Sequence, residues 1–136
     1  LLSCLRLAAK RGVDVRIYTP GVPDKPTIYQ LTRSYFPHLL RAGVRIFSYT
    51  PGFLHAKTWL VDDRIAAVGT VNLDYRSLYL HFENSVLIYG GAVLDDVRRD
   101  LAEIEKERAE VKLADCRTGF FGTMYSAVLR LVAPLC

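Results

Sequence analysis

The sequence has few cysteines and no pattern that would bind a metal through them. Its three cysteines, Cys4, Cys116 and Cys136, are widely spaced and form no CxxC or Cys/His arrangement. An odd number of isolated cysteines supports neither a disulfide framework nor a zinc site. We therefore expect a reducing environment such as the cytosol.

Long apolar runs are also missing. No stretch reaches about 18 uninterrupted apolar residues, so the sequence predicts no membrane-spanning helix. The start lacks the charged-then-apolar layout of a signal peptide. Any membrane contact is expected to be peripheral, or to come from chain outside the given residues. The first residue is Leu and residues 1–12 read as the last turns of a helix, so we expect a fragment of a longer chain.

The overall composition is that of a soluble domain with a core. Hydrophobic residues make up 51% of the sequence and charged residues 24%. The formal net charge of +4 suits a partner that carries phosphate, either a nucleic acid or an anionic lipid surface. Charge alone does not choose between these two partners.

Hydrophobic periodicity predicts alternating helices and strands. The expected helices cover residues 1–11, 27–42, 93–112 and 122–132, and the expected strands cover 13–20, 44–49, 53–61, 64–69 and 85–89. Pro37 predicts a break or kink in the second helix, and Asp62-Asp63 predicts a turn between the third and fourth strands. This order predicts an α/β layer fold with some parallel pairing. No linker or low-complexity tract marks an internal domain boundary.

Polar side chains stand at the ends of the hairpin predicted over residues 53–72. Strand alternation would place His55 and Lys57 on one face. A bare HxK pattern is more often a strand end with a satisfied histidine than a site. Here, however, Gly69 ends the next strand and permits close backbone approach, and Thr70 and Asn72 then add a hydroxyl and an amide. Such a donor cluster suits the non-bridging oxygens of a phosphate.

A carboxylate joins this set from the next strand. Glu83 leads into the apolar run at residues 85–89, where it needs a partner. An imidazole N–H is the expected one.

The pattern HxKx4Dx6G[ST]xN is filled by His55, Lys57, Asp62, Gly69, Thr70 and Asn72, and it resembles the signature of the phospholipase D superfamily. The surrounding sequence resembles the C-terminal half of bacterial cardiolipin synthases over nearly the whole chain. The chain differs from that family at Thr70, where Ser is usual, at His81, where Asn is common, and at its last residue, where Leu is usual. The resemblance implies a phospholipase D-like layered fold, with a mixed β-sheet flanked by helices, as one half of a two-domain enzyme.

The resemblance also implies a mechanism. One histidine attacks phosphorus to give a phosphohistidine, and a second histidine protonates the leaving alcohol; His55 suits either role. Lys57, Asn72 and Thr70 would neutralise and orient the phosphoryl oxygens. Glu83 would hold the other imidazole nitrogen of His55.

The remaining motif positions are interpreted as structural. Gly69 permits close packing, and Asp62 faces away from His55 and is expected to pair in the turn with Arg64 or Arg76. No carboxylate pair has metal-binding spacing, so no metal or other cofactor is predicted. The helix over residues 122–132 is expected to pack against the body of the protein rather than to lie on a membrane.

One motif supplies one histidine, so residues 1–136 are predicted to be a C-terminal catalytic domain with half an active site. The other half would come from a missing N-terminal domain or from a dimer mate. The leading hypothesis is transfer between two phosphatidylglycerols to give cardiolipin and glycerol, at the surface of the bacterial cytoplasmic membrane. The alternatives are a phospholipase D or nuclease-type phosphodiesterase, and a non-catalytic phosphate-binding module. Nucleic acid is not the expected partner.

Overall fold

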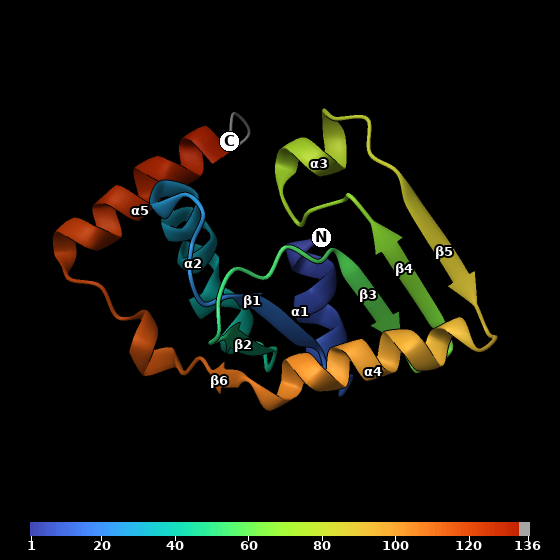
Figure 1. Cartoon of the computed structure of the whole chain (residues 1–136). Helices are drawn as coiled ribbons and strands as arrows, with labels where there is room; N and C mark the ends of the chain where they lie inside the picture. Colours follow the sequence, from blue (N-terminus) through green and yellow to red (C-terminus); the bar gives the residue numbers. More distant parts are fainter. Residues whose placement is uncertain (134–136) are drawn as a thin grey trace. The chain divides into compact units, whose positions relative to one another are not determined.

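The computed structural model describes residues 1–133, and the chain divides into two compact units. Unit 1 comprises residues 1–54 together with the chain from Arg108 onward, and unit 2 comprises His55–Glu107 (Figure 1). Unit 2 is therefore inserted into the sequence of unit 1.

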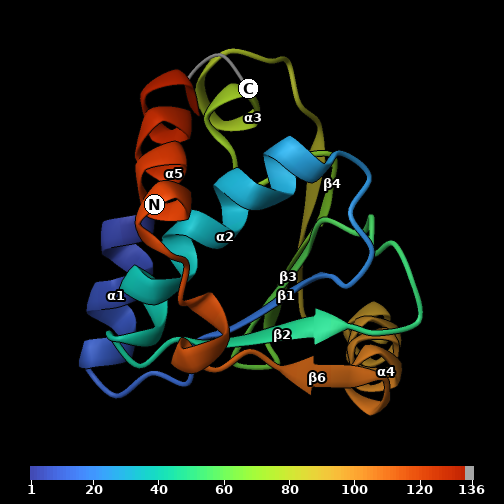
Figure 2. The same ribbon diagram turned by 90° about the vertical axis from the view of Figure 1, so that its left-hand side faces the viewer.

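Unit 1 is built on a three-stranded mixed sheet. Its strands are β1 (Arg16–Pro20), β2 (Arg45–Tyr49) and β6 (Arg108–Glu110), in the order β1-β2-β6. β1 and β2 run parallel, and β6 runs antiparallel to β2 (Figure 2). The helix α2 (Pro26–Leu40) makes the crossover that a parallel pair requires. The predicted α/β fold with parallel pairing is thereby confirmed.

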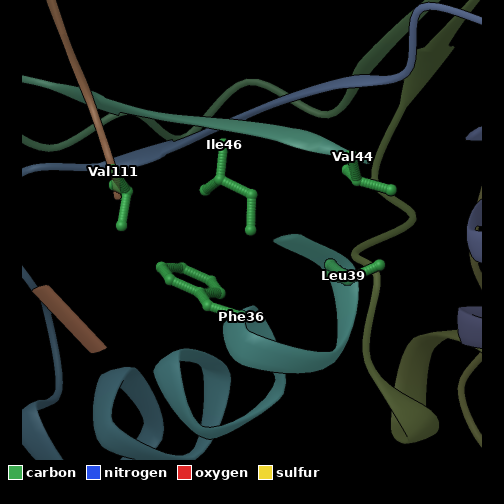
Figure 3. Close-up of a cluster of buried hydrophobic side chains, with 5 residues drawn as sticks. All are labelled: Phe36, Leu39, Val44, Ile46 and Val111. Carbon is green, nitrogen blue, oxygen red and sulfur yellow. The ribbon is translucent and has the colours of Figure 1, made fainter. Parts of the chain in front are cut away.

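The core of unit 1 lies between α2 and β2. Phe36 and Leu39 point from α2 toward Val44, Ile46 and Val111 (Figure 3). The side chain of Ile46 is fully buried. Burial of an aliphatic or aromatic side chain of this size contributes roughly 1.5–3 kcal/mol, so each member of this cluster stabilises unit 1.

Three further helical segments complete unit 1. The helix α1 (Leu2–Lys10) packs apolar residues against the core and ends before Gly12, which adopts a φ of +92°. The short 3-10 helix η1 (Leu113–Cys116) contacts α2. The helix α5 (Phe120–Val132) runs alongside α2 (Figures 1 and 2).

Of the break or kink predicted at Pro37, the break does not form, and the kink stays a prediction. α2 continues through this residue to Leu40. Pro37 lies in the last turn, where its carbonyl accepts a hydrogen bond from Arg41 N at 3.2 Å and so closes the helix.

Unit 2 is built on a three-stranded antiparallel sheet. Its strands are β3 (Thr58–Val61), β4 (Ile65–Gly69) and β5 (Ser85–Tyr89). The helix α4 (Val93–Lys106) contacts β4 and β5 and buries Leu94 and Ile104. The short helix α3 (Tyr75–Tyr79) lies toward the end of the sheet where β4 ends and β5 begins, and α4 lies at the other end (Figure 1).

The predicted turn at Asp62-Asp63 is confirmed. Both residues have positive φ angles, 50° and 52°, and Arg64 N donates to Val61 O at 3.1 Å. Two consecutive positive φ angles are typical of the hairpin turn whose twist matches that of the flanking strands.

Three predicted boundaries are wrong. The strand expected over residues 13–20 begins only at Arg16. The strand expected over residues 53–61 begins only at Thr58, because β4 ends at Gly69 and earlier residues have no strand beside them; Gly69 N still donates to Lys57 O at 3.3 Å. The helix expected over residues 93–112 ends at Lys106. Its last part forms β6 instead, because pairing with the open edge of β2 also buries Val111 in the core.

Within residues 1–133, none of the helices combines the length and the apolar character needed to cross a lipid bilayer.

Candidate active site

The predicted site residues come from three segments at one end of the sheet in unit 2. His55 and Lys57 precede β3, Thr70 and Asn72 follow β4, and Glu83 precedes β5. In this antiparallel sheet β3 and β5 begin where β4 ends, so the backbone brings the three segments to the same edge. α3 lies toward this end of the sheet (Figure 1).

Thr70 fixes the position of Glu83. Its hydroxyl donates to Glu83 Oε2 and accepts a hydrogen bond from Asn84 N at 3.0 Å. The main chains also meet here, since Thr70 N donates to Asn84 O at 2.9 Å. The Glu83 side chain is only 15% exposed. The carboxylate is thus held against the ends of β4 and β5.

Gly69 allows these two segments to approach. A Cβ at this position would lie 2.2 Å from Asn84 O and 2.6 Å from Ser85 Cα. Both atoms belong to the backbone, so no side-chain movement would relieve the contact. The glycine is required by close backbone packing, as its place in the motif suggests.

The side chain of Asn72 is hydrogen-bonded to α3. Its Nδ2 donates to Ser77 Oγ at 3.3 Å, and Ser77 is buried. The N–H of Ser77 in turn donates to Asp74 Oδ1 at 2.7 Å, which caps the helix. Sequence reasoning missed Ser77, although the spacing Asp-x-x-Ser is a recognisable helix start.

The hydroxyls of Thr70 and Ser77 favour the ionised form of Glu83. The hydrogen bond from Thr70 is the largest cause of a lowered pKa of Glu83, followed by the hydrogen bond from Ser77. Partial burial opposes this shift, and electrostatic interactions with His81 and Lys57 add to it. Glu83 is therefore ionised at neutral pH and can accept a proton donor.

Lys57 and His55 are joined through the main chain. Lys57 Nζ donates to His55 O at 2.8 Å, and its charge contributes the least of the causes that lower the pKa of Glu83. The His55 side chain is exposed. The expected bond between its imidazole and Glu83 stays a prediction.

A second histidine lies beside Glu83. His81 Nδ1 is 3.8 Å from Glu83 Oε1, and Arg76 Nε donates to His81 Nε2 at 3.2 Å. An arginine N–H only donates, so Nε2 is the acceptor and the proton of the neutral ring sits on Nδ1, the nitrogen nearer to Glu83. Sequence reasoning noted His81 only as a departure from the family pattern and did not connect it with the carboxylate.

Asp62 lies at the other end of the sheet, in the β3–β4 turn. The ion pair of this turn is formed by its neighbour, with Arg98 Nε 3.4 Å from Asp63 Oδ1. Arg76 is engaged with His81 instead. Asp63 thus pairs with Arg98 of α4, and the pairing expected of Asp62 stays a prediction.

Among residues 1–133, no three His, Cys, Asp or Glu side chains come together as they would around a metal ion.

The fold and the motif together define a family. The family model described as cardiolipin synthase, PLD-like domain, matches residues 1–105, which include every predicted site residue. The chain belongs to this family. The resemblance predicted from the motif is confirmed.

Individual relatives agree with this assignment. An uncharacterized protein of Streptococcus mutans is 47% identical over 132 residues, which are 96% of this chain and 29% of the relative. Cardiolipin synthase 1 of Bacillus anthracis is 41% identical over 135 residues, 98% of this chain and 26% of the relative. The chain thus spans between 26% and 29% of the length of these curated relatives.

A solved structure supports the fold. The crystal structure of Nuc, a phospholipase D family member from Salmonella typhimurium, aligns with a TM-score of 0.69 at 18% identity. The alignment covers 82% of this chain and 72% of that chain.

Proposed function

We propose that residues 1–136 are the C-terminal phospholipase D-like catalytic domain of a cardiolipin synthase, a phosphatidyltransferase. Family membership and the 41% identity to a cardiolipin synthase support the reaction class and a phospholipid substrate. The observation that carries the proposal is the set of contacts around Glu83, whose carboxylate is held by Thr70 and whose ionised form is favoured by Thr70, Ser77 and Lys57 at one end of a single sheet.

In the first half-reaction, an imidazole nitrogen attacks the phosphorus of one phosphatidylglycerol. The N–P bond forms as the bond from phosphorus to the head-group glycerol oxygen breaks, and a second histidine protonates that oxygen so that glycerol leaves. His55 is one of these two histidines. Glu83, ionised at neutral pH, accepts the other ring N–H of His55 and orients it.

Charge on the phosphoryl oxygens is neutralised by this chain's own donors. The Lys57 ammonium and the Asn72 amide donate to the non-bridging oxygens as charge gathers there. The Thr70 hydroxyl donates its hydrogen bond to Glu83. Thr70 therefore acts mainly by fixing that carboxylate, and it contributes to phosphate binding through its position at the same edge of the sheet.

In the second half-reaction, a glycerol hydroxyl of another phosphatidylglycerol attacks the phosphohistidine. The N–P bond breaks, a new P–O bond completes cardiolipin, and the proton of the attacking hydroxyl returns to the second histidine. That histidine belongs to the other half-site, from a preceding domain or a dimer mate. The reaction takes place at the surface of the bacterial cytoplasmic membrane, where the lipid substrates lie.

The test is turnover of labelled phosphatidylglycerol by the full-length protein. Formation of cardiolipin with an equal amount of glycerol supports the proposal, whereas phosphatidic acid without cardiolipin indicates a phospholipase D-type hydrolase and rejects it. His55→Gln should abolish turnover, and Lys57→Met should reduce it by roughly 100-fold.

Lys106→Met is the matched control for Lys57→Met. Lys106 pairs with Glu103 on the exposed face of α4, so its loss should leave turnover unchanged. Unchanged turnover in His55→Gln would favour a non-catalytic phosphate-binding module.

A further inference from the structure

A chain of ionisable side chains runs from α3 to the residues before β5. It comprises Arg76, His81 and Glu83, which all belong to unit 2. The Glu83 side chain is 15% exposed and the His81 side chain is 47% exposed. The proposed reaction gives a role to Glu83 but none to Arg76 or His81. These two residues are therefore candidates for a further role at the site.

Arg76 holds His81 at two points. The main-chain N–H of His81 donates to Arg76 O at 2.8 Å, and Arg76 Nε donates to His81 Nε2 at 3.2 Å. An arginine nitrogen cannot accept a hydrogen bond, so the second bond requires a ring whose Nε2 is bare and whose proton is on Nδ1. A hydrogen bond at one ring nitrogen decides which nitrogen carries the proton. Arg76 thereby selects one tautomer of the neutral ring.

The selected tautomer directs its proton toward Glu83. The distance from His81 Nδ1 to Glu83 Oε1 is 3.8 Å, which is longer than a hydrogen bond. Contacts between groups of a catalytic site are often long before the substrate binds, and they shorten in the complex. Because the His81 side chain is partly exposed, its ring has room to turn. The ring therefore offers Oε1 an N–H donor.

The acceptor positions of Glu83 show what this donor can do. A carboxylate has about four acceptor positions on its two oxygens. The Thr70 hydroxyl takes one of them on Oε2, and the Ser77 hydroxyl also donates to the carboxylate. A third bond, from His81 to Oε1, leaves one position for the ring N–H of His55. It also keeps the carboxylate from turning about its last bond.

We propose that His81 is a positioning residue, which holds Oε1 of Glu83 through an Nδ1–H that Arg76 fixes. The carboxylate held in this way receives the ring N–H of His55 in one orientation. This inference rests on the proposed function, because it adds a support to the contact between Glu83 and His55 that the transfer reaction uses.

Nitrogen-15 NMR of the histidine-labelled full-length protein tests the tautomer. At about pH 9, above the ordinary pKa of imidazole, the His81 signals are those that vanish in His81→Asn. We expect Nδ1 to be the protonated ring nitrogen. Arg76→Met removes the donor to Nε2 and should raise the share of rings protonated on Nε2. The control Arg99→Met, which removes an exposed partner of Asp96 on α4, should leave the tautomer unchanged.

Three substitutions of His81 test the effect on phosphatidyl transfer. Asparagine places its amide nitrogen as many bonds from Cβ as histidine places Nδ1, whereas glutamine places it as far away as Nε2, and leucine has no donor. We expect His81→Asn to keep kcat within about twofold. His81→Gln and His81→Leu should each lower kcat about tenfold, the effect of one lost hydrogen bond, with KM unchanged. A merely structural role would not separate asparagine from glutamine in this way.

The possible contrary results are distinct. A wild-type ring protonated on Nε2, an unchanged tautomer in Arg76→Met, or equal kcat in His81→Leu and the wild type would each overturn the positioning role. A loss in His81→Asn as large as in His81→Leu would also do so. Absence of cardiolipin formation by the wild type would count against the proposed function, and the NMR measurement, which needs no turnover, would still decide whether Arg76 and His81 are arranged as proposed.

Discussion

Replacing Gly69 with alanine should damage the candidate active site through the backbone. The new methyl group would lie 2.2 Å from Asn84 O and 2.6 Å from Ser85 Cα, below the 3.0 Å that real Cβ contacts essentially never cross. Because both neighbours are main-chain atoms, the start of β5 must move away from the end of β4.

The size of the effect follows from these distances. Ordinary contact begins near 3.4 Å, so the gap at Asn84 O must open by 3.4 − 2.2 = 1.2 Å. An opening of that size breaks the 2.9 Å bond from Thr70 N to Asn84 O. Overpacking costs about 1–3 kcal/mol and a lost hydrogen bond about 1 kcal/mol. We expect a loss of about 2–4 kcal/mol in the free energy of unfolding, with loss of transfer activity as Thr70 and Glu83 separate.

Urea unfolding followed by circular dichroism measures the stability change. Gly52→Ala is the matched control, since a Cβ there meets nothing within 4 Å and the backbone is not in a glycine-only region; it should change stability by less than about 0.5 kcal/mol. If Gly69→Ala unfolds at the same urea concentration as the wild type and retains activity, the reasoning from close backbone approach is refuted.

Three further predictions address the carboxylate, the helix that supports it and the core. Thr70→Val should raise the pKa of Glu83, because the Thr70 hydroxyl is the largest cause of its lowering, while Thr70→Ser should not; NMR titration of the Glu83 carboxyl measures both. Since the folded pKa is depressed, the wild type should lose stability as pH falls from the unfolded pKa through the folded pKa, and Thr70→Val should lose less. Asp74→Ala removes the cap on Ser77 N and should cost about 1 kcal/mol in urea unfolding; an unchanged midpoint would contradict the capping role. Ile46→Ala, at a fully buried position, should cost about 2–5 kcal/mol by the same assay, whereas Ile28→Ala, 39% exposed, should cost clearly less, and equal losses would place the core elsewhere.

Local sequence patterns predicted the elements whose formation depends on their own residues. β2, β4 and β5 follow apolar alternation or short β-branched runs, and each was predicted to within one residue of its observed bounds. The start of β3 and the whole of β6 depend on where a neighbouring strand ends or offers an open edge. No local pattern contains that information, so the charged residues 107–112 were read as helix.

The same division applies to the site. The motif spacing selected Thr70 and Glu83, which the structure brings into contact. It did not reveal Ser77, nor the contact of Arg76 with His81 beside the carboxylate. Those partners depend on how α3 folds back along the chain, which motif spacing does not encode.

The insertion of unit 2 between β2 and β6 has a consequence for synthesis on the ribosome. Tyr49 and Arg108 face each other across the β2–β6 pair, so the intervening chain must emerge before that pair can close. Unit 2, whose residues are contiguous from His55 to Glu107, has all of its strands available earlier. We expect nascent chains stalled so that residue 107, but not β6, has emerged from the ribosome to protect unit 2 from protease while β2 still presents a bare edge, a stage at which binding by a chaperone would be most useful.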